Sequence, residues 1–243
     1  MENRNAKYNP GISVSPYTKV NLDRIDKEDH KTMVRTALDK LDTEKELSVV
    51  DVGCGNGELL AAFQRSFPHW KYWGYDMVPE FVETAKKFPG LEEATLEVRD
   101  FMDVDGEYDL CTCTSVLQIF PDIEERLDKL LTLVKPGGYV FGDGLFNKYS
   151  VEVCMQYQDR YHPEYSGKWS TDWHQHSRRR ISDHLDGKVA DFEFHDMVMD
   201  VDIPHDPEKP SNYTFTFRAA DGRNILTNGL NIIKNKTLLV IRK

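Results

Sequence analysis

Residues 49–58, Val49-Val50-Asp51-Val52-Gly53-Cys54-Gly55-Asn56-Gly57-Glu58, decide the fold of this chain. The apolar run before Gly53 predicts a buried strand, and the leucines and alanines after Gly57 have the spacing of a helix. Alternate glycines between them allow positive φ angles and let a ligand approach bare backbone. The stretch therefore predicts a strand, a glycine loop and a helix whose first amides can meet a carboxylate or a phosphate.

The spacing of these glycines differs from that of two common nucleotide-binding loops. A dinucleotide-binding fingerprint would place its third glycine at position 58, which is Glu58 in this chain. A phosphate-binding loop would continue with Gly-Lys-Ser or Gly-Lys-Thr, and the sequence after Gly57 does not. The loop therefore favours a ligand other than a dinucleotide or a nucleoside triphosphate.

Acidic residues end the next two predicted strands. Asp76 lies about 20 residues beyond the glycine loop, where a carboxylate can accept hydrogen bonds from the two hydroxyls of a ribose. Asp100 and Phe101 follow the third strand and offer a carboxylate for an exocyclic amine and a ring for stacking, which suits adenine. Together with the loop, these residues predict a nucleoside whose far end is held by backbone groups.

Strands and helices alternate on both sides of the loop. The apolar runs predict strands at residues 47–52, 72–76, 94–98, 108–113 and 139–145. Helical spacing predicts helices at residues 27–41, directly after Gly57, at 79–87 and at 122–135. This alternation is typical of parallel βαβ units in a doubly wound α/β sheet.

The pattern changes after residue 146. Aromatic residues and histidines within 148–190 predict helices that form a cap. Late strands are predicted at 192–201 and 236–242, with a hairpin between them that starts at 213–217 and turns at Asp221-Gly222. We therefore expect a single domain over residues 1–243. Its parts are an N-terminal arm and helix (1–44), a core (45–145), a helical cap (146–190) and C-terminal strands with the hairpin (191–243).

Composition narrows the class of protein. A chain of 243 residues that is 40% hydrophobic can bury a sizeable core, and its net charge of −10 argues against a general grip on nucleic-acid phosphates. The four cysteines lack the spacing of a zinc site, and the apolar runs are far shorter than the ~20 residues that cross a membrane. The first residues lack the apolar segment of a signal peptide. We expect a cytoplasmic protein with no metal site, membrane segment or nucleic-acid partner.

The ordered set of motifs resembles the class I S-adenosylmethionine-dependent methyltransferases. The matching pieces are 49–58, Gly74-Tyr75-Asp76, Arg99-Asp100-Phe101, 108–118 and Leu133-Val134-Lys135-Pro136-Gly137-Gly138. The resemblance covers residues 45–145 and makes this part the cofactor-binding core. It implies a seven-stranded sheet of order 3-2-1-4-5-7-6 with the seventh strand antiparallel, and the two late strands fit that ending.

The resemblance also implies S-adenosyl-L-methionine as the cofactor. Asp51 would brace the loop, and the loop backbone would hold the methionine part. The backbone at Cys113 and Thr114 would hold the amino group, and Gln118 would face the substrate side. The predicted cofactor-binding residues are Asp51, Gly53, Cys54, Gly55, Asn56, Gly57, Asp76, Met77, Asp100, Phe101, Cys113, Thr114 and Gln118.

The segment after the fifth strand carries the candidate acceptor site. His174 or His176 would act as a catalytic base, because an alcohol must lose its proton as it attacks. Trp173, Arg178 and Tyr17 are candidate substrate contacts: Arg178 would pair with an acidic group, and Tyr17 in the arm would close over the cofactor. The alternative is that the histidines pack or lie on the surface, the arginines form a solvated face and the arm touches nothing.

These hypotheses favour a methyltransferase that acts on a small-molecule acceptor, with oxygen as the acceptor atom because of the histidine pair. Three alternatives stay open. The acceptor could be the nitrogen of a small amine or heterocycle, or it could be an RNA or a protein. The chain could also bind the cofactor without catalysis, since a fold does not by itself guarantee an activity.

Overall fold

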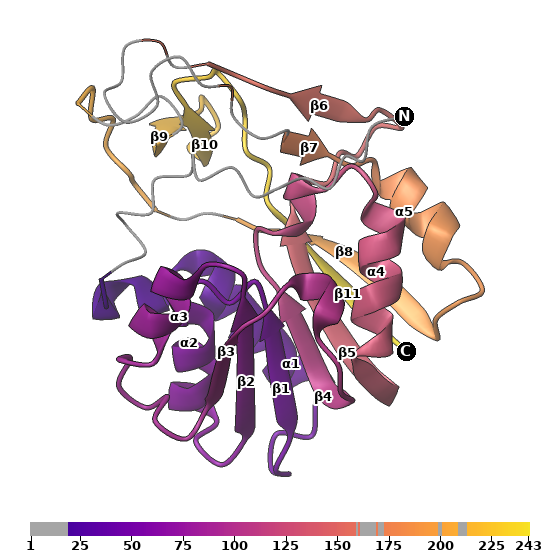
Figure 1. Ribbon diagram of the computed structural model, residues 1–243. Helices are drawn as coiled ribbons and strands as arrows, with labels where there is room; N and C mark the ends of the chain where they lie inside the picture. Colours follow the sequence, from indigo (N-terminus) through magenta and orange to yellow (C-terminus); the bar gives the residue numbers. More distant parts are fainter. Residues whose placement is uncertain (1–18, 159, 161–168, 170–172, 199–200, 209–212) are drawn as a thin grey trace.

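A central sheet with helices on both faces forms the body of the molecule (Figure 1). This computed structural model describes residues 19–158, 160, 169, 173–198, 201–208 and 213–243. Short strand pairs lie beyond the end of the sheet at which its parallel strands finish (Figure 1). The sheet therefore presents its carboxyl edge to these added strands, and ligands of such sheets bind at that edge.

Seven strands form the main sheet, in the order β3-β2-β1-β4-β5-β11-β8. They are β1 (Ser48–Val52), β2 (Lys71–Asp76), β3 (Thr95–Val98), β4 (Tyr108–Cys113), β5 (Val134–Gly144), β8 (Asp191–Asp196) and β11 (Thr237–Arg242). The first five run parallel, whereas β11 is antiparallel to both β5 and β8. The predicted order 3-2-1-4-5-7-6 is thereby confirmed.

Neighbouring residues of β1 pack against different helices. The helices are α1 (Glu28–Lys40), α2 (Glu58–Ser66), α3 (Pro79–Ala85), α4 (Ile123–Thr132) and α5 (Arg178–Leu185). Val49 on β1 belongs to the same buried cluster as Phe63 on α2, and its neighbour Val50 belongs to the cluster of Leu127 on α4. Burial of each such side chain contributes about 1.5–3 kcal/mol. Both faces of β1 are therefore fixed, which holds its end and the following glycine loop in place.

The predicted helical cap at 146–190 is only partly helical in the residues that the structure describes. Strands β6 (Val153–Met155) and β7 (Trp173–Gln175) pair antiparallel there, and α5 follows them. The prediction of helices across the histidine stretch is therefore wrong for β7. Strands of three residues are too short to show a period, and their pairing joins positions far apart in the sequence.

Strand β5 also differs from the prediction. It begins at Val134 rather than at residue 139, and α4 ends at Thr132, so Pro136 lies within a strand. The pairing of β4 with β5 shifts register between Tyr108 and Leu110, beside this proline. Proline lacks an N–H group and is tolerated in a sheet at such irregularities.

The predicted hairpin is confirmed. Strands β9 (Thr214–Arg218) and β10 (Asn224–Asn228) pair antiparallel outside the main sheet. At the turn, Gly222 has a φ of 85° and its amide donates to the carbonyl of Ala219. The hairpin lies beyond the carboxyl edge of the sheet, as do β6 and β7 (Figure 1).

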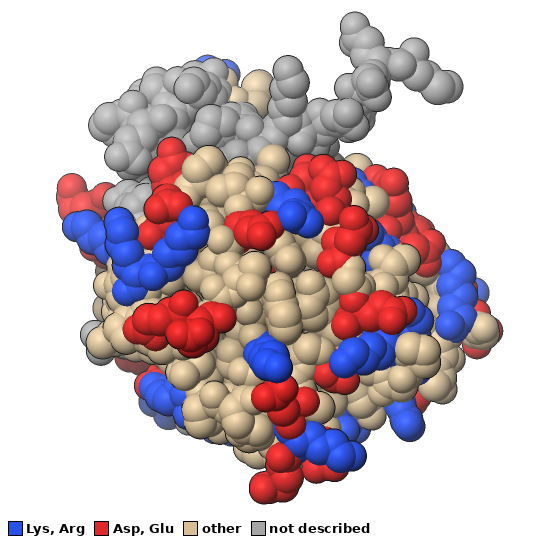
Figure 2. Space-filling model, turned by 60° about the horizontal axis from the view of Figure 1, so that its bottom comes forward, with Lys and Arg blue, Asp and Glu red and all other residues tan. Residues whose placement is uncertain are grey.

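The opposite end of the molecule is a mixed-charge surface. Figure 2 shows this face, on which acidic and basic side chains are interspersed between uncharged residues. Within the described part of the chain, no helix is both long and apolar enough to span a membrane.

Candidate active site

The glycine loop connects β1 to α2 at the carboxyl edge of the sheet. Gly53, Gly55 and Gly57 have φ angles of 73°, 54° and 81°, as their spacing predicts. The amides of Gly53 and Cys54 both donate to the carbonyl of Tyr75, at 2.7 and 3.0 Å. A Cβ atom on Gly53 would lie 2.4 Å from Val116, whereas one on Gly55 would meet nothing within 4 Å. The loop is therefore packed at Gly53 and open at Gly55.

Asp76 joins the end of β2 to this loop. Its Oδ2 atom accepts a hydrogen bond from the Gly55 amide at 2.9 Å, and Oδ1 accepts one from the Val78 amide at 2.9 Å. Burial raises the pKa of this carboxyl above its usual value, although the amide hydrogen bonds oppose that shift. Each carboxylate oxygen has a second lone pair, so ligand hydroxyls can still bind.

Asp51 lies beneath the loop and is fully buried. Its Oδ1 atom accepts a hydrogen bond from the Thr112 hydroxyl at 2.7 Å, which links β1 to β4. Burial raises the pKa of Asp51 to about 7, and the nearby Asp76 and Asp143 carboxylates add to the shift. This geometry suits a residue that fastens the strand before the loop to β4 rather than one that reaches a ligand.

Three more of the predicted cofactor-binding residues follow β2 and β3. Asp100 and Phe101 were predicted to bind the adenine, and Met77 comes directly after Asp76. Asp100 is exposed, and its Oδ1 atom accepts a hydrogen bond from the Met102 amide at 2.9 Å, which begins the 3-10 helix η3 (Phe101–Asp103). Phe101 is buried, with its ring centroid 6.2 Å from that of Phe120. The Met77 side chain is 45% exposed beside Asp76. An exposed acid, a ring and an exposed thioether thus border this part of the edge.

The end of β4 leads into the 3-10 helix η4 (Leu117–Ile119). Cys113 is buried at the strand end and Thr114 is half-buried, while Ser115 takes a φ of 58°. Gln118 is buried in η4. The backbone therefore turns sharply at the place predicted to hold the amino group of the cofactor.

A cluster of polar side chains around Lys236 also lies at the carboxyl edge and was not predicted from the sequence. Its Nζ atom lies 2.6 Å from Asp29 Oδ2, 3.1 Å from Asp143 Oδ2 and 3.2 Å from Ser115 Oγ. Burial opposes the charges, but the two acids outweigh it, so the pKa of Lys236 is raised and that of Asp29 is lowered. These contacts tie α1, β5 and β11 together. No local pattern could predict them, because Lys236 and Asp29 are 207 residues apart.

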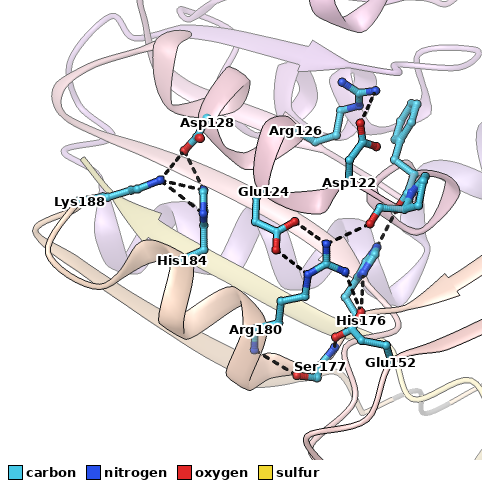
Figure 3. A network of polar contacts seen from close by, with 12 residues as sticks. Asp122, Glu124, Arg126, Asp128, Glu152, His176, Ser177, Arg180, His184 and Lys188 are labelled. Carbon is cyan, nitrogen blue, oxygen red and sulfur yellow. Dashed lines mark hydrogen bonds and ion pairs between the residues drawn. The ribbon is translucent and has the colours of Figure 1, made fainter. Parts of the chain in front are cut away.

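Both ring nitrogens of His176 bind acceptors within the protein (Figure 3). Nε2 lies 2.9 Å from the Phe120 carbonyl oxygen, and Nδ1 lies 3.1 Å from Glu152 Oε2. The side chain is 1% exposed. Because neither nitrogen offers a lone pair to a substrate, this geometry favours a structural role for His176 over the predicted role as a base.

Arg180 joins the same network (Figure 3). Its guanidinium binds Glu124 at 2.5 Å, Glu152 at 3.0 Å and the Pro121 carbonyl at 3.1 Å. Glu152 Oε1 in turn accepts the Ser177 amide at 2.6 Å. The network therefore fastens the segment from β6 to α5 onto the start of α4.

The other predicted acceptor residues are placed as follows. His174 on β7 stacks on His176, with ring centroids 5.6 Å apart and planes 6° from parallel. Trp173 is half-buried on the same strand. Arg178 donates to the Phe146 carbonyl at 3.3 Å and to Thr237 Oγ1 at 2.8 Å, and it pairs with Asp196. Tyr17 lies outside the described residues.

Arg178 therefore binds groups of this chain instead of standing open for an acidic substrate. Among the described residues, no group of three or more His, Cys, Asp or Glu side chains is placed to hold a metal ion.

A comparison with protein-family models matches residues 50–140 to the methyltransferase domain. Over these residues, the chain is similar to a methyltransferase domain. The match covers β1 through the first half of β5, including the glycine loop, Asp76 and η4. This is the part of the chain from which the sequence resemblance was drawn.

Curated relatives match the methyltransferase domain over part of their length. A malonyl-[acyl-carrier protein] O-methyltransferase of Priestia megaterium is 26% identical over 127 residues, 49% of this chain and 46% of that protein. A ubiquinone biosynthesis O-methyltransferase of Acinetobacter baylyi is 33% identical over 100 residues, 38% of this chain and 41% of that protein. The chain thus matches less than half the length of these relatives.

A solved structure resembles nearly the whole fold around the methyltransferase domain. It is the magnesium protoporphyrin IX methyltransferase of Synechocystis PCC 6803 with bound SAH. The TM-score is 0.56 at 14% identity, over 99% of this chain and 98% of that chain. The likeness supports the fold that the strand order describes.

Proposed function

We propose that the protein transfers a methyl group from S-adenosylmethionine to an oxygen atom of a small-molecule acceptor. The observation that carries this proposal is the link between Asp76 and the glycine loop, in which the carboxylate binds the Gly55 amide beside open space. Asp76 could bind the ribose hydroxyls, and the loop backbone beside it could bind the rest of the ligand. The relatives that are O-methyltransferases support the choice of oxygen.

The residues at the carboxyl edge fit this cofactor in three parts. Asp76 would bind the ribose hydroxyls, and the exposed Asp100 beside Phe101 would bind the adenine. The loop backbone and the first amides of α2 would hold the methionine carboxylate, because helix N-termini favour anions. When bound, the cofactor supplies a methyl group on a positively charged sulfur.

Methyl transfer requires first of all that the acceptor atom is aligned with the methyl group. The protein must hold the acceptor oxygen about 3 Å from the methyl carbon and exclude water. We assign the role of base to His174, since both nitrogens of its neighbour His176 are engaged. Gln118 and Trp173 would line the acceptor, because η4 packs against β7. Tyr17 stays a proposed lid over the cofactor.

The proposal is tested by incubating the protein with S-adenosylmethionine that carries a deuterated methyl group. Separate reactions contain panels of phenols, alcohols, carboxylic acids, amines, an RNA and a protein extract. We expect a labelled O-methyl product from a small molecule. A labelled N-methyl product, RNA or protein would contradict the assigned acceptor. Cofactor binding without transfer to any panel would favour a non-catalytic binding protein.

A further inference from the structure

Lys234 stands where three separate parts of the chain meet. It lies between β10 and β11, and its backbone amide donates to the Leu226 carbonyl at 2.8 Å. Its Nζ atom donates to Thr214 Oγ1 on β9 at 2.7 Å. The same atom lies 5.0 Å from the centroid of the Trp173 ring on β7. The ammonium group is therefore held by a hydroxyl and an aromatic face rather than extended into solvent.

The charge of Lys234 has no carboxylate partner among the described residues. Lys236, two positions later, differs in that Asp29 and Asp143 both bind it. Burial lowers the pKa of Lys234 to about 8, and the charge of Lys236 adds to that effect. A partly buried cation without a counter-charge is unfavourable, and the aromatic face of Trp173 offsets only part of that cost. An anion bound at this place would stabilise the protein.

The position of Lys234 is on the acceptor side of the proposed site. Lys236 contacts Ser115 and Asp143, at the ends of β4 and β5. Lys234 contacts the hairpin and β7, which lie farther out beyond the carboxyl edge (Figure 1). Strand β7 packs against η4, the element that carries Gln118. An anion bound to Lys234 would therefore lie on the acceptor side of the cofactor, away from the groups that we propose bind the cofactor itself.

We propose that Lys234 and Thr214 bind a carboxylate of the methyl acceptor, so that the substrate is a small acid. This inference rests on the proposed function. An ammonium group has three hydrogens, and one of them binds Thr214. Because the Thr214 hydroxyl accepts that bond, its own hydrogen can be donated to the same carboxylate. One cation and one hydroxyl suit a singly charged anion, whereas a phosphate dianion usually binds more donors.

Trp173 would help to set the orientation of the bound acid. With the ammonium group 5.0 Å from its centroid, the indole fixes where the charge lies relative to β7. The acid would be held at Lys234 while a hydroxyl of the same molecule reaches the methyl group. The carboxylate would thus determine the orientation of the substrate as well as its affinity.

The test uses pairs of probes that differ in charge and hardly in shape. Salicylate with salicylamide, and 4-hydroxybenzoate with 4-hydroxybenzamide, are titrated calorimetrically into the protein saturated with S-adenosylhomocysteine. For at least one pair, we expect the acid to bind about tenfold or more tightly than its amide. Lys234→Met should remove that preference, whereas Thr214→Ser should retain it and Thr214→Val should weaken it.

A second measurement follows the lysine itself. Lysines are reductively methylated with ¹³C-formaldehyde, and the Lys234 signal is assigned by its loss in Lys234→Arg. Addition of the preferred acid should raise the pH at which this signal titrates, and addition of the amide should not.

Two results would overturn the inference. The first is equal binding of acids and amides, or failure of all probes to bind. The second is an acid preference that survives in Lys234→Met. Binding of S-adenosylhomocysteine is measured first in each variant and should be unchanged in Lys234→Met. If the wild-type protein failed to bind it, the proposed function itself would be at fault.

Discussion

The Oδ2 atom of Asp76 accepts a hydrogen bond from the backbone amide of Gly55 at 2.9 Å, so the acid at the end of β2 and the middle of the glycine loop form one unit. Its open side lies over Gly55, where a Cβ atom would meet nothing within 4 Å. Because two backbone amides hold the Asp76 carboxylate, this side chain should lose little conformational entropy when the cofactor binds.

Alanine at Gly53 should mainly lower stability, whereas alanine at Gly55 should mainly weaken cofactor binding. A Cβ at Gly53 would lie 2.4 Å from Val116 Cγ2, and the backbone there is left-handed with a φ of 73°. Gly53→Ala should therefore lower the free energy of unfolding by about 2–5 kcal/mol, the clash and the backbone together. In Gly55→Ala, only the left-handed backbone lowers the free energy of unfolding, by about 1–2 kcal/mol, but the new methyl group would enter the space that we propose for the cofactor. We expect it to weaken S-adenosylhomocysteine binding about tenfold or more.

Chemical denaturation and calorimetry check both parts of this prediction. The double variant Gly53→Ala/Val116→Ala is the control, because it removes the clash and should regain part of the lost stability. Wild-type affinity in Gly55→Ala would show that the open space is not the cofactor site.

Asp51 should make stability fall as the pH rises. Its pKa is about 7 in the folded protein and 3.8 without burial, so between these values the folded state holds a proton that the unfolded state has lost. The free energy of unfolding then decreases by about 1.4 kcal/mol for each pH unit within that window. Denaturation from pH 4 to 8 should show a smaller decrease in Asp51→Asn. Parallel curves for the two proteins would refute this account.

The two hydrogen bonds of His176 can be separated by two substitutions. His176→Gln can still donate to the Phe120 carbonyl from the position of Nε2, and His176→Asn can still donate to Glu152 from the position of Nδ1. The Phe120 ring centroid lies 6.2 Å from that of Phe101, a residue that we propose binds the adenine. We therefore expect His176→Asn to weaken S-adenosylhomocysteine binding several-fold more than His176→Gln does.

Melting temperatures of both His176 variants are measured alongside their affinities, since each loses one buried hydrogen bond worth about 1 kcal/mol. Equal affinities for the two variants would mean that the bond to Phe120 does not position the adenine side.

The sequence predicted the core of the fold well because its signals there are local. The apolar runs predicted the bounds of β1 and β4 to within one residue. The alternate glycines predicted the positive φ angles of the loop. Asp76 was predicted beside the loop because parallel strands finish at the same edge. The strand order came from the resemblance, which supplied the antiparallel β11.

The parts that escaped prediction depend on contacts between distant residues. Lys236 meets Asp29 across 207 positions, and Arg180 meets Glu124 across 56. The arginine run looked like a site for an acidic substrate, yet Arg178 and Arg180 bind acids of this chain. The positive charge of an arginine does not show whether its partner is a substrate or an acidic residue of the same chain. The short strand that carries His174 likewise depends on its partner β6 rather than on its own pattern.

The central claim is that the Asp76 unit binds the cofactor, and calorimetric titration of S-adenosylhomocysteine into wild-type protein and Asp76→Asn tests it most directly. Asparagine keeps the shape but removes the charge that strengthens hydrogen bonds to the ribose hydroxyls. It also leaves one oxygen, instead of two, to accept from the Gly55 and Val78 amides. We predict one bound ligand per wild-type chain, with affinity about tenfold or more lower in the variant while its fold is retained by circular dichroism. Equal affinity in the two proteins, or no binding by the wild type, would contradict the account.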